Sequence, residues 1–400
     1  MKYRNTSLRA RRKAVTLIEL LVAIAATLVL MTAVTTAISM LGGRMGNNRA
    51  TIEMIDQLRS VRQKLQSDLA GHTAQALPWQ DAETGGGYIE IIEGPLKDHP
   101  SSWPNNDNRF GDTDDVIALT VRSQGPPFVS TAGNSAGGND DESYVAEVIW
   151  YLKPDQSATP RPGVQQLYKL YRRVELVLPD GRAGGASTTD GRLAELTMRE
   201  NRWGTLNGKR SETMPSELIP SNLPTRREDV VLTNVLSFDV KVWDPQAPIY
   251  ADASNEKRVM APGDPGFRPG GTVIGRGAYV DLGYLQELSE LATPTSHFSS
   301  MPNPPISGGW NTIPITFIWD TWPRFYERDG KDQNGNGKID EGYDGIDNGG
   351  IQGVVDDPGE LETSPPYSHP LRGIRITIRI YEPASQQVRQ LSVVQHFMPE

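Results

Sequence analysis

The chain contains no cysteine, and only five of its 400 residues are histidine. Disulfides, thiol nucleophiles and thiolate metal sites are therefore excluded. No metal-site or catalytic spacing links the histidines, so each is expected to be a surface or strand residue. They are His72, His99, His297, His369 and His396. Stability must come from apolar burial, or from a metal held by oxygen ligands.

Two common catalytic motifs are also missing, since the chain has neither an H-E-x-x-H helix nor a Walker loop. An enzyme is therefore not expected. Glycine and proline are abundant, at 39 and 30 residues, which indicates long surface loops.

Acidic residues are absent from the first 14 positions, which carry six basic side chains. These are Lys2, Arg4, Arg9, Arg11, Arg12 and Lys13. Subtracting their six charges from the net charge of −9 leaves −15 for the remainder. This negative charge on residues 15–400 argues against nucleic acid as a partner, because duplex binding depends on basic side chains that neutralise phosphates.

Residues 15–41 form an apolar run whose only ionisable side chain is Glu19. At about 1.5 Å per residue, a helix of this length exceeds a hydrocarbon layer of about 30 Å. The positive-inside rule keeps the basic leader in the cytoplasm and places the rest of the chain outside it. The sequence thus predicts a single-pass protein of the inner (cytoplasmic) membrane with an extracytoplasmic head.

Three interpretations of this run compete. A secretory signal has a shorter apolar core, of about 7 to 15 residues, although residues 37–39 imitate its cleavage site. An uncleaved anchor explains the length but gives no purpose to Glu19, since a carboxylate in a membrane segment costs about 2 to 3 kcal/mol or more. The third interpretation accounts for that carboxylate.

The stretch AVTLIELLV, residues 14–22, resembles the type III signal of type IV pilins and type II secretion pseudopilins. The resemblance implies that prepilin peptidase cuts between Ala14 and Val15 and methylates the new amino terminus. The family usually has Gly before the cut and Phe after it. It also implies that Glu19, fifth after the cut, meets the terminal amine of a neighbouring subunit, an ion pair that offsets desolvation and sets axial register. The alternative is a Glu19 at headgroup level in a lone anchor.

No proline occurs in residues 15–77, so the helix is expected to continue to about residue 70. Residues 42–77 are expected to form an amphipathic extension, with a possible bend at Gly42, Gly43 and Gly46. Its apolar stripe is Met54, Leu58, Val61, Leu65 and Leu69.

After Pro78 the apolar period changes to two, which predicts a β-rich head over residues 78–400. The predicted strands are residues 88–92, 116–122, 144–152, 166–177, 230–243, 315–319, 371–381 and 387–397. The last two are expected to form an antiparallel hairpin with one buried face. The predicted fold class is α+β, pilin-like, with a long amino-terminal helix packed on an antiparallel sheet. Long loops are expected at residues 98–112, 130–141, 180–191 and 244–276.

Short strands of the head resemble those of the J-type minor pseudopilin and the W-type minor pilin, notably TNVLSFDVKVWD at residues 233–244. The resemblance implies a minor subunit of a type II secretion pseudopilus or a type IV pilus. Its expected partners are other pilin subunits, the prepilin peptidase/methyltransferase, the inner-membrane assembly platform and the bilayer around residues 15–41.

An acidic segment, residues 332–362, begins with a pattern similar to an EF-hand loop. Carboxylate and amide oxygens at alternate positions suit Ca²⁺, Gly337 permits the turn, and Tyr343 stands where a bidentate Glu is expected. Asp344 or Glu341 would have to substitute for it. The expected ligands are Asp332, Asn334, Asn336, the Lys338 carbonyl, Asp340 and Asp344. Residues 347–357 resemble a decayed second loop, and a solvated acidic loop is the alternative for the whole segment.

Two function classes follow from these features. The first is a filament subunit, and the second is a membrane-anchored, calcium-dependent adhesin or surface-binding protein. No cofactor other than calcium is implied by these features.

Overall fold

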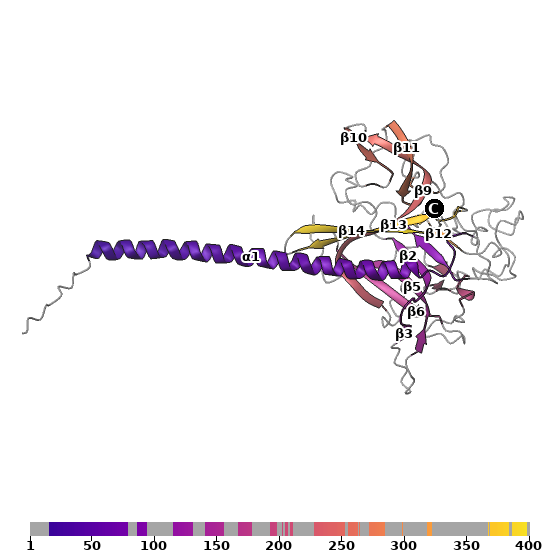
Figure 1. Cartoon of the computed structure of the whole chain (residues 1–400), viewed down its shortest axis with the longest axis horizontal. Coiled ribbons are helices and arrows are strands. Elements are labelled where there is room, and N and C mark those ends of the chain that lie inside the picture. Colours follow the sequence, from indigo (N-terminus) through magenta and orange to yellow (C-terminus); the bar gives the residue numbers. More distant parts are fainter. Residues whose placement is uncertain are drawn as a thin grey trace, which may run out of the picture. The chain divides into compact units, whose positions relative to one another are not determined.

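The computed structural model describes the amino-terminal helix and most of a β-rich head. The described residues are 16–78, 86–93, 115–130, 141–155, 167–177, 193–197, 202, 205–206, 209–210, 228–252, 255–262, 264, 272–284, 298, 318–321, 367, 369–383 and 386–397. The chain divides into two compact units, one of Met1–Ile55 with Glu382–Gln386 and one of Asp56–Tyr381 with Gln387–Glu400. The helix α1, Leu17–Ala70, contributes to both units (Figure 1).

The first part of α1 presents apolar side chains to its surroundings on every side. Leu17–Ile38 is long and apolar enough to cross a membrane, and none of it is buried within the chain. Its threonines bond back to the helix, since the hydroxyls of Thr27, Thr35 and Thr36 donate to the carbonyls of Ile24, Met31 and Thr32 at 2.7–2.8 Å. These internal bonds leave little polarity for lipid to solvate. The helix is uninterrupted at Gly42, Gly43 and Gly46, where a bend was expected.

The second part of α1, residues 56–70, belongs to the head unit and buries a stripe of Leu58, Val61, Leu65 and Leu69. The three- and four-residue steps of the stripe keep these side chains on one face, as predicted. The helix ends at Ala70, before residue 77, where the predicted extension ended. Gly71 follows the helix where the chain turns, and a Cβ there would lie 2.6 Å from the Arg122 carbonyl oxygen. Only glycine allows this close approach to the sheet.

The head is built on a ten-stranded antiparallel sheet. The strand order is β12-β1-β2-β5-β6-β9-β13-β14, and β10 and β11 also pair with β9. The strands of this sheet are β1 Ile89–Ile92, β2 Val116–Arg122, β5 Val145–Pro154, β6 Tyr168–Leu176, β9 Glu228–Asp252, β10 Asn255–Met260, β11 Thr272–Val280, β12 Ile318–Asp320, β13 Gly373–Glu382 and β14 Gln387–His396. Two small hairpins accompany it, β3 Phe128–Ser130 with β4 Asp141–Ser143, and β7 Thr205–Leu206 with β8 Lys209–Arg210. A 3₁₀ turn spans Glu195–Thr197.

Each predicted strand overlaps a strand of the structure, although of residues 315–319 only the last two are described, and the antiparallel sheet with an amino-terminal apolar helix is confirmed. The loop predicted over residues 244–276 is wrong, because β9 continues to Asp252 and then pairs with β10 and β11. Proline and glycine there indicated a loop, but register shifts in the β9–β11 ladder accommodate them, with Pro248 opposite Arg276.

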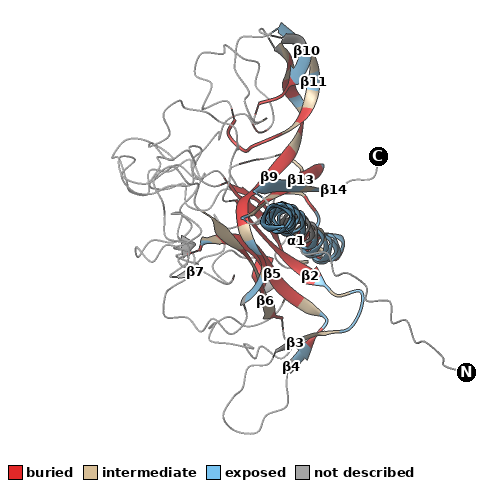
Figure 2. Cartoon of the chain, turned by 90° about the vertical axis from the view of Figure 1, so that its left-hand side faces the viewer, coloured by how far each residue is buried: buried red, intermediate tan, exposed pale blue. Residues whose placement is uncertain are grey.

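Both faces of the sheet are buried near its centre, whereas one buried face was expected for the last strands. On β9, Phe238, Val240 and Val242 are fully buried, and so are Asp239 and Lys241, whose side chains alternate with them. Buried residues dominate β2 and β9, and exposed residues dominate β14 (Figure 2). The second face therefore holds buried charges, which need partners.

Candidate functional site: the amino-terminal helix and its seat on the head

Glu19 lies in the first turn of α1 and closes a capping box with Thr16. The Thr16 amide donates to Glu19 Oε2 at 2.9 Å, the Thr16 hydroxyl donates to the same oxygen at 3.0 Å, and the Glu19 amide donates to the hydroxyl at 3.3 Å. A T-x-x-E sequence satisfies amide groups that a helix otherwise leaves open at its start. The motif was readable in the sequence and was missed there.

The capping box gives Glu19 a structural role within a single chain, because its carboxylate accepts both bonds from Thr16 at the start of the helix. A carboxylate near a helix amino terminus is also favoured by the helix dipole. The processing residues Ala14 and Val15 lie outside the described residues. The geometry thus places a negative charge at the amino-terminal end of an apolar helix.

Asp68, in the last turns of α1, anchors the helix to the sheet. Its carboxylate accepts two bonds from Arg172 on β6, at 2.8 and 2.7 Å, and one from the Trp150 indole on β5 at 2.9 Å. The aspartate and arginine side chains are 4 % and 13 % exposed. A bidentate ion pair with a third hydrogen-bond donor is a strong, directional contact where solvent is largely excluded. It joins α1 to two neighbouring central strands.

On the second face of the sheet, Arg202 is buried beside two carboxylates. Its Nη1 donates to Asp320 on β12 at 2.6 Å and to Glu90 on β1 at 3.2 Å. The guanidinium carbon lies 3.8 Å from the centre of the Tyr88 ring, and the remaining donors reach backbone carbonyls. Burial opposes the positive charge, but the two carboxylates outweigh it and raise the pKa of Arg202.

A second buried cluster surrounds Lys241 on β9. Its ammonium group contacts Asp281, which follows β11, and lies 3.5 Å from Asp239 Oδ1. Burial raises the pKa of Asp239 to about 6, against the lowering influence of Lys241. Burial disfavours the charge on Lys241, yet Asp239 and Asp281 together raise its pKa. The cluster explains how charged side chains remain on a buried face.

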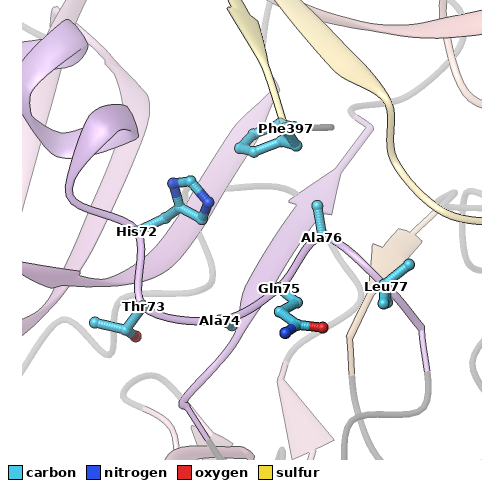
Figure 3. Close-up of a pocket in the computed structure, with 7 residues that line it drawn as sticks. All are labelled: His72, Thr73, Ala74, Gln75, Ala76, Leu77 and Phe397. Atoms are coloured by element: carbon cyan, nitrogen blue, oxygen red, sulfur yellow. The ribbon is translucent and has the colours of Figure 1, made fainter. Parts of the chain in front are cut away.

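A shallow pocket of about 380 Å³ lies where the chain leaves α1 (Figure 3). It is lined by residues 72–77 and by Phe397, whose ring meets the His72 ring edge-on at 5.2 Å. His72 Nδ1 lies 2.7 Å from the Leu69 carbonyl oxygen, which can only accept, so the ring donates to the helix end. His72 thus caps the end of the helix.

The expected calcium ligands, from Asp332 to Asp344, lie outside the described residues. Within the described part of the chain, no group of three His, Asp or Glu side chains is placed to hold a metal. The sequence contains one G-x-S-x-G string, residues 133–137, a pattern that serine hydrolases use for their nucleophile. It falls between β3 and β4, which pair antiparallel, whereas a nucleophile elbow joins a strand to a helix.

Comparison with known proteins finds similarity at the amino terminus. Residues 9–35 match the sequence model of a family described as the prokaryotic N-terminal methylation motif. No curated protein and no solved structure shows significant similarity to the chain. The match covers the second half of the basic leader, Glu19 and most of the apolar segment that the structure leaves exposed. The chain therefore carries a type IV pilin-like amino-terminal segment, with a methylation motif leading into a membrane-length helix.

Proposed function

We propose that this chain is a minor pilin or pseudopilin, cut between Ala14 and Val15 and assembled into a type IV pilus or a type II secretion pseudopilus. The observation that carries the proposal is the methylation motif at residues 9–35 followed by an apolar helix with no cover in its own chain. Such a helix needs either lipid or the helices of other subunits around it. The chain would act as a structural subunit of the inner membrane and the filament, without catalysis of its own.

In this function Glu19 selects and aligns subunits. Its carboxylate is held at the amino-terminal end of α1 by Thr16, close in sequence to the amine that cutting before Val15 creates. A neighbour's amine would offset the cost of an unpaired carboxylate in an apolar bundle. Since a shifted neighbour leaves both charges unpaired, the pair favours one axial register.

The Asp68 contact has a mechanical part in this function. Subunits of a filament are held through their helices, so any load on the head passes through the seat of α1. The three bonds from Arg172 and Trp150 join that seat to strands β5 and β6. Calcium at residues 332–344 is proposed to steady the head by neutralising the acidic segment.

Mass spectrometry of the mature amino terminus tests the proposal. Methylated Val15 is expected. An intact Met1, or a new terminus near Met40, would instead favour a membrane-anchored adhesin and would overturn the filament assignment.

Replacement of Glu19 tests its role apart from processing. Glu19→Ala is expected to be cut at the same place but to be lost from sheared filaments and to accumulate in the inner membrane. Glu53→Ala is the matched control, because Glu53 is exposed on the same helix and pairs only locally with Arg49. Normal incorporation of Glu19→Ala would contradict the proposed pairing.

A further inference from the structure

Strand β14 forms an open edge of the sheet. It ends the strand order and, among the described strands, pairs with β13 alone. Seven of its ten residues are exposed, on both faces of the strand, including Val388 at 51 % and Val394 at 44 %. An edge strand that nothing covers presents a row of unpaired backbone groups.

The contacts between β13 and β14 show which backbone groups point outward. Three contacts share one register: Phe397 N to Arg372 O at 3.0 Å, Thr377 Oγ1 with Ser392 Oγ at 3.5 Å, and Arg379 Nε to Gln390 Oε1 at 3.0 Å. The sum of the residue numbers is the same for each pair, so no bulge intervenes. Because Phe397 bonds toward β13, the odd-numbered residues of β14 do so too. The amides of Val388, Gln390, Ser392 and Val394 therefore face away from the sheet.

β14 has few of the features that protect natural edge strands. Such edges are usually short, bulged, or interrupted by proline or several charges. β14 has ten residues, one register, no proline and a single charged side chain, Arg389. Valine and leucine make up four of its ten residues, and valine in particular is favoured in strands.

A second copy of the chain does not fit this edge as part of the same sheet. Antiparallel pairing of β14 with itself requires a two-fold axis normal to the sheet. That axis would reverse the direction of residues 56–70 of α1, which pack on the sheet, so this part of the helix would run in opposite directions in the two copies. Parallel pairing of the two outer edges requires a two-fold axis along the strands, which would turn the second sheet over and place residues 56–70 of the two α1 helices on opposite faces.

A copy stacked head to tail through the far end of the main strand order is also excluded, because that edge is closed. That edge is β12, whose residues Ile318, Trp319 and Asp320 are 0–1 % exposed. Asp320 is further occupied by Arg202. A copy of the chain therefore has no free edge at β12 to offer to β14.

We propose that β14 is a docking edge for an extended segment of a different protein, which adds to the sheet as an antiparallel strand. The outward amides and carbonyls of the even-numbered residues would supply the backbone bonds. Arg389 stands at a position where cross-strand side chains come closest, so the segment should carry an acid there. Residues opposite Leu391 and Val393 should be apolar. This proposal stands whether or not the chain enters a filament.

A designed peptide tests the edge directly. The probe is a fluorescent decapeptide of alternating valine and threonine with one glutamate opposite Arg389, titrated into the full chain in detergent micelles. Saturable binding is expected, with Kd on the order of 100 μM for a single added strand. Hydrogen exchange should slow at the amides of Val388, Gln390 and Ser392, and a peptide with lysine in place of glutamate should bind about two- to tenfold more weakly.

Two variants separate edge pairing from other binding. Ser392→Pro removes an outward donor while leaving the β13 ladder, because proline is tolerated at such edge positions. It should bind the glutamate peptide at least about tenfold more weakly, whereas Ser392→Ala should bind normally. Arg389→Glu should reverse the preference to the lysine peptide, and it does not depend on the fold accepting proline.

Three outcomes would overturn the proposal. The first is the absence of saturable binding at peptide concentrations of about 1 mM, the concentration at which even very weak strand addition is measurable. The second is equal binding by Ser392→Pro, Ser392→Ala and the unaltered chain, combined with no change of charge preference in Arg389→Glu. The third is a cross-link between Ser392→Cys residues of two copies, since it would place a second copy at the edge.

Discussion

Replacing Asp68 by alanine is expected to destabilise the head by about 3–5 kcal/mol, the usual cost of removing one partner from a buried ion pair. The structure supports this magnitude because Arg172 keeps its charge at 13 % exposure and loses two bonds, while the Trp150 indole loses its acceptor. For a unit of this size the melting temperature should fall by about 10 °C. Denaturant unfolding followed by tryptophan fluorescence provides the measurement, since Trp150 itself contacts Asp68.

The reasoning has a control and a rescue. Asp56→Asn lies on the same helix at an exposed ion pair with Arg59 and should leave stability unchanged. The double variant Asp68→Asn with Arg172→Met should recover most of the loss, because it removes both charges and keeps an acceptor for Trp150. A loss below about 1 kcal/mol in Asp68→Ala, or a double variant no more stable than the single one, would refute the account.

Three further predictions concern the charges of the head. The folded pKa of Asp239 lies at about 6, above its ordinary 3.8, so the protonated side chain stabilises the fold at low pH. This contribution to the free energy of unfolding, about 3 kcal/mol, is lost as pH rises from about 4 to 6. Asp239→Asn should remove this part of the pH dependence of unfolding. Arg202→Leu leaves two buried carboxylates facing each other, so its stability deficit, measured by urea unfolding, should be large at pH 7 and shrink at pH 5; a deficit independent of pH would contradict this. Chelation of calcium should lower the melting temperature of the chain but not of Asp332→Ala with Asp340→Ala, and an unchanged temperature in the unaltered chain would count against the calcium site.

The elements that the sequence predicted well are those with a local pattern. The helix followed from an uninterrupted apolar run and the stripe from Leu58 to Leu69, and β13 followed from isoleucine at every second position. β10 and β11 were missed because their neighbourhood is rich in Gly and Pro and their strand pattern is weak. They are held by pairing with the far half of β9, which a local pattern does not reveal.

The polar contacts divide in the same way. The capping box of Thr16 and Glu19 is local and was readable. The partners of Asp68 lie 82 and 104 residues away in sequence, and Arg202 reaches Asp320 across 118 residues. A single charged residue gives no sign of such a partner, and its burial is set by the tertiary fold. These contacts required the structure.

The bare surface of Leu17–Ile38 restricts the ways in which this chain can exist. Apolar side chains point outward on every side of this helix segment, so exposing it to water is unfavourable both before and after any assembly. If the chain moves from lipid into a bundle of helices, the segment passes from one apolar environment to another, and the hydrophobic effect contributes little free energy to that transfer. The equilibrium between lipid and helix bundle would then depend on a few hydrogen-bonding and charged atoms at the start of α1, where small chemical changes would have the largest effect.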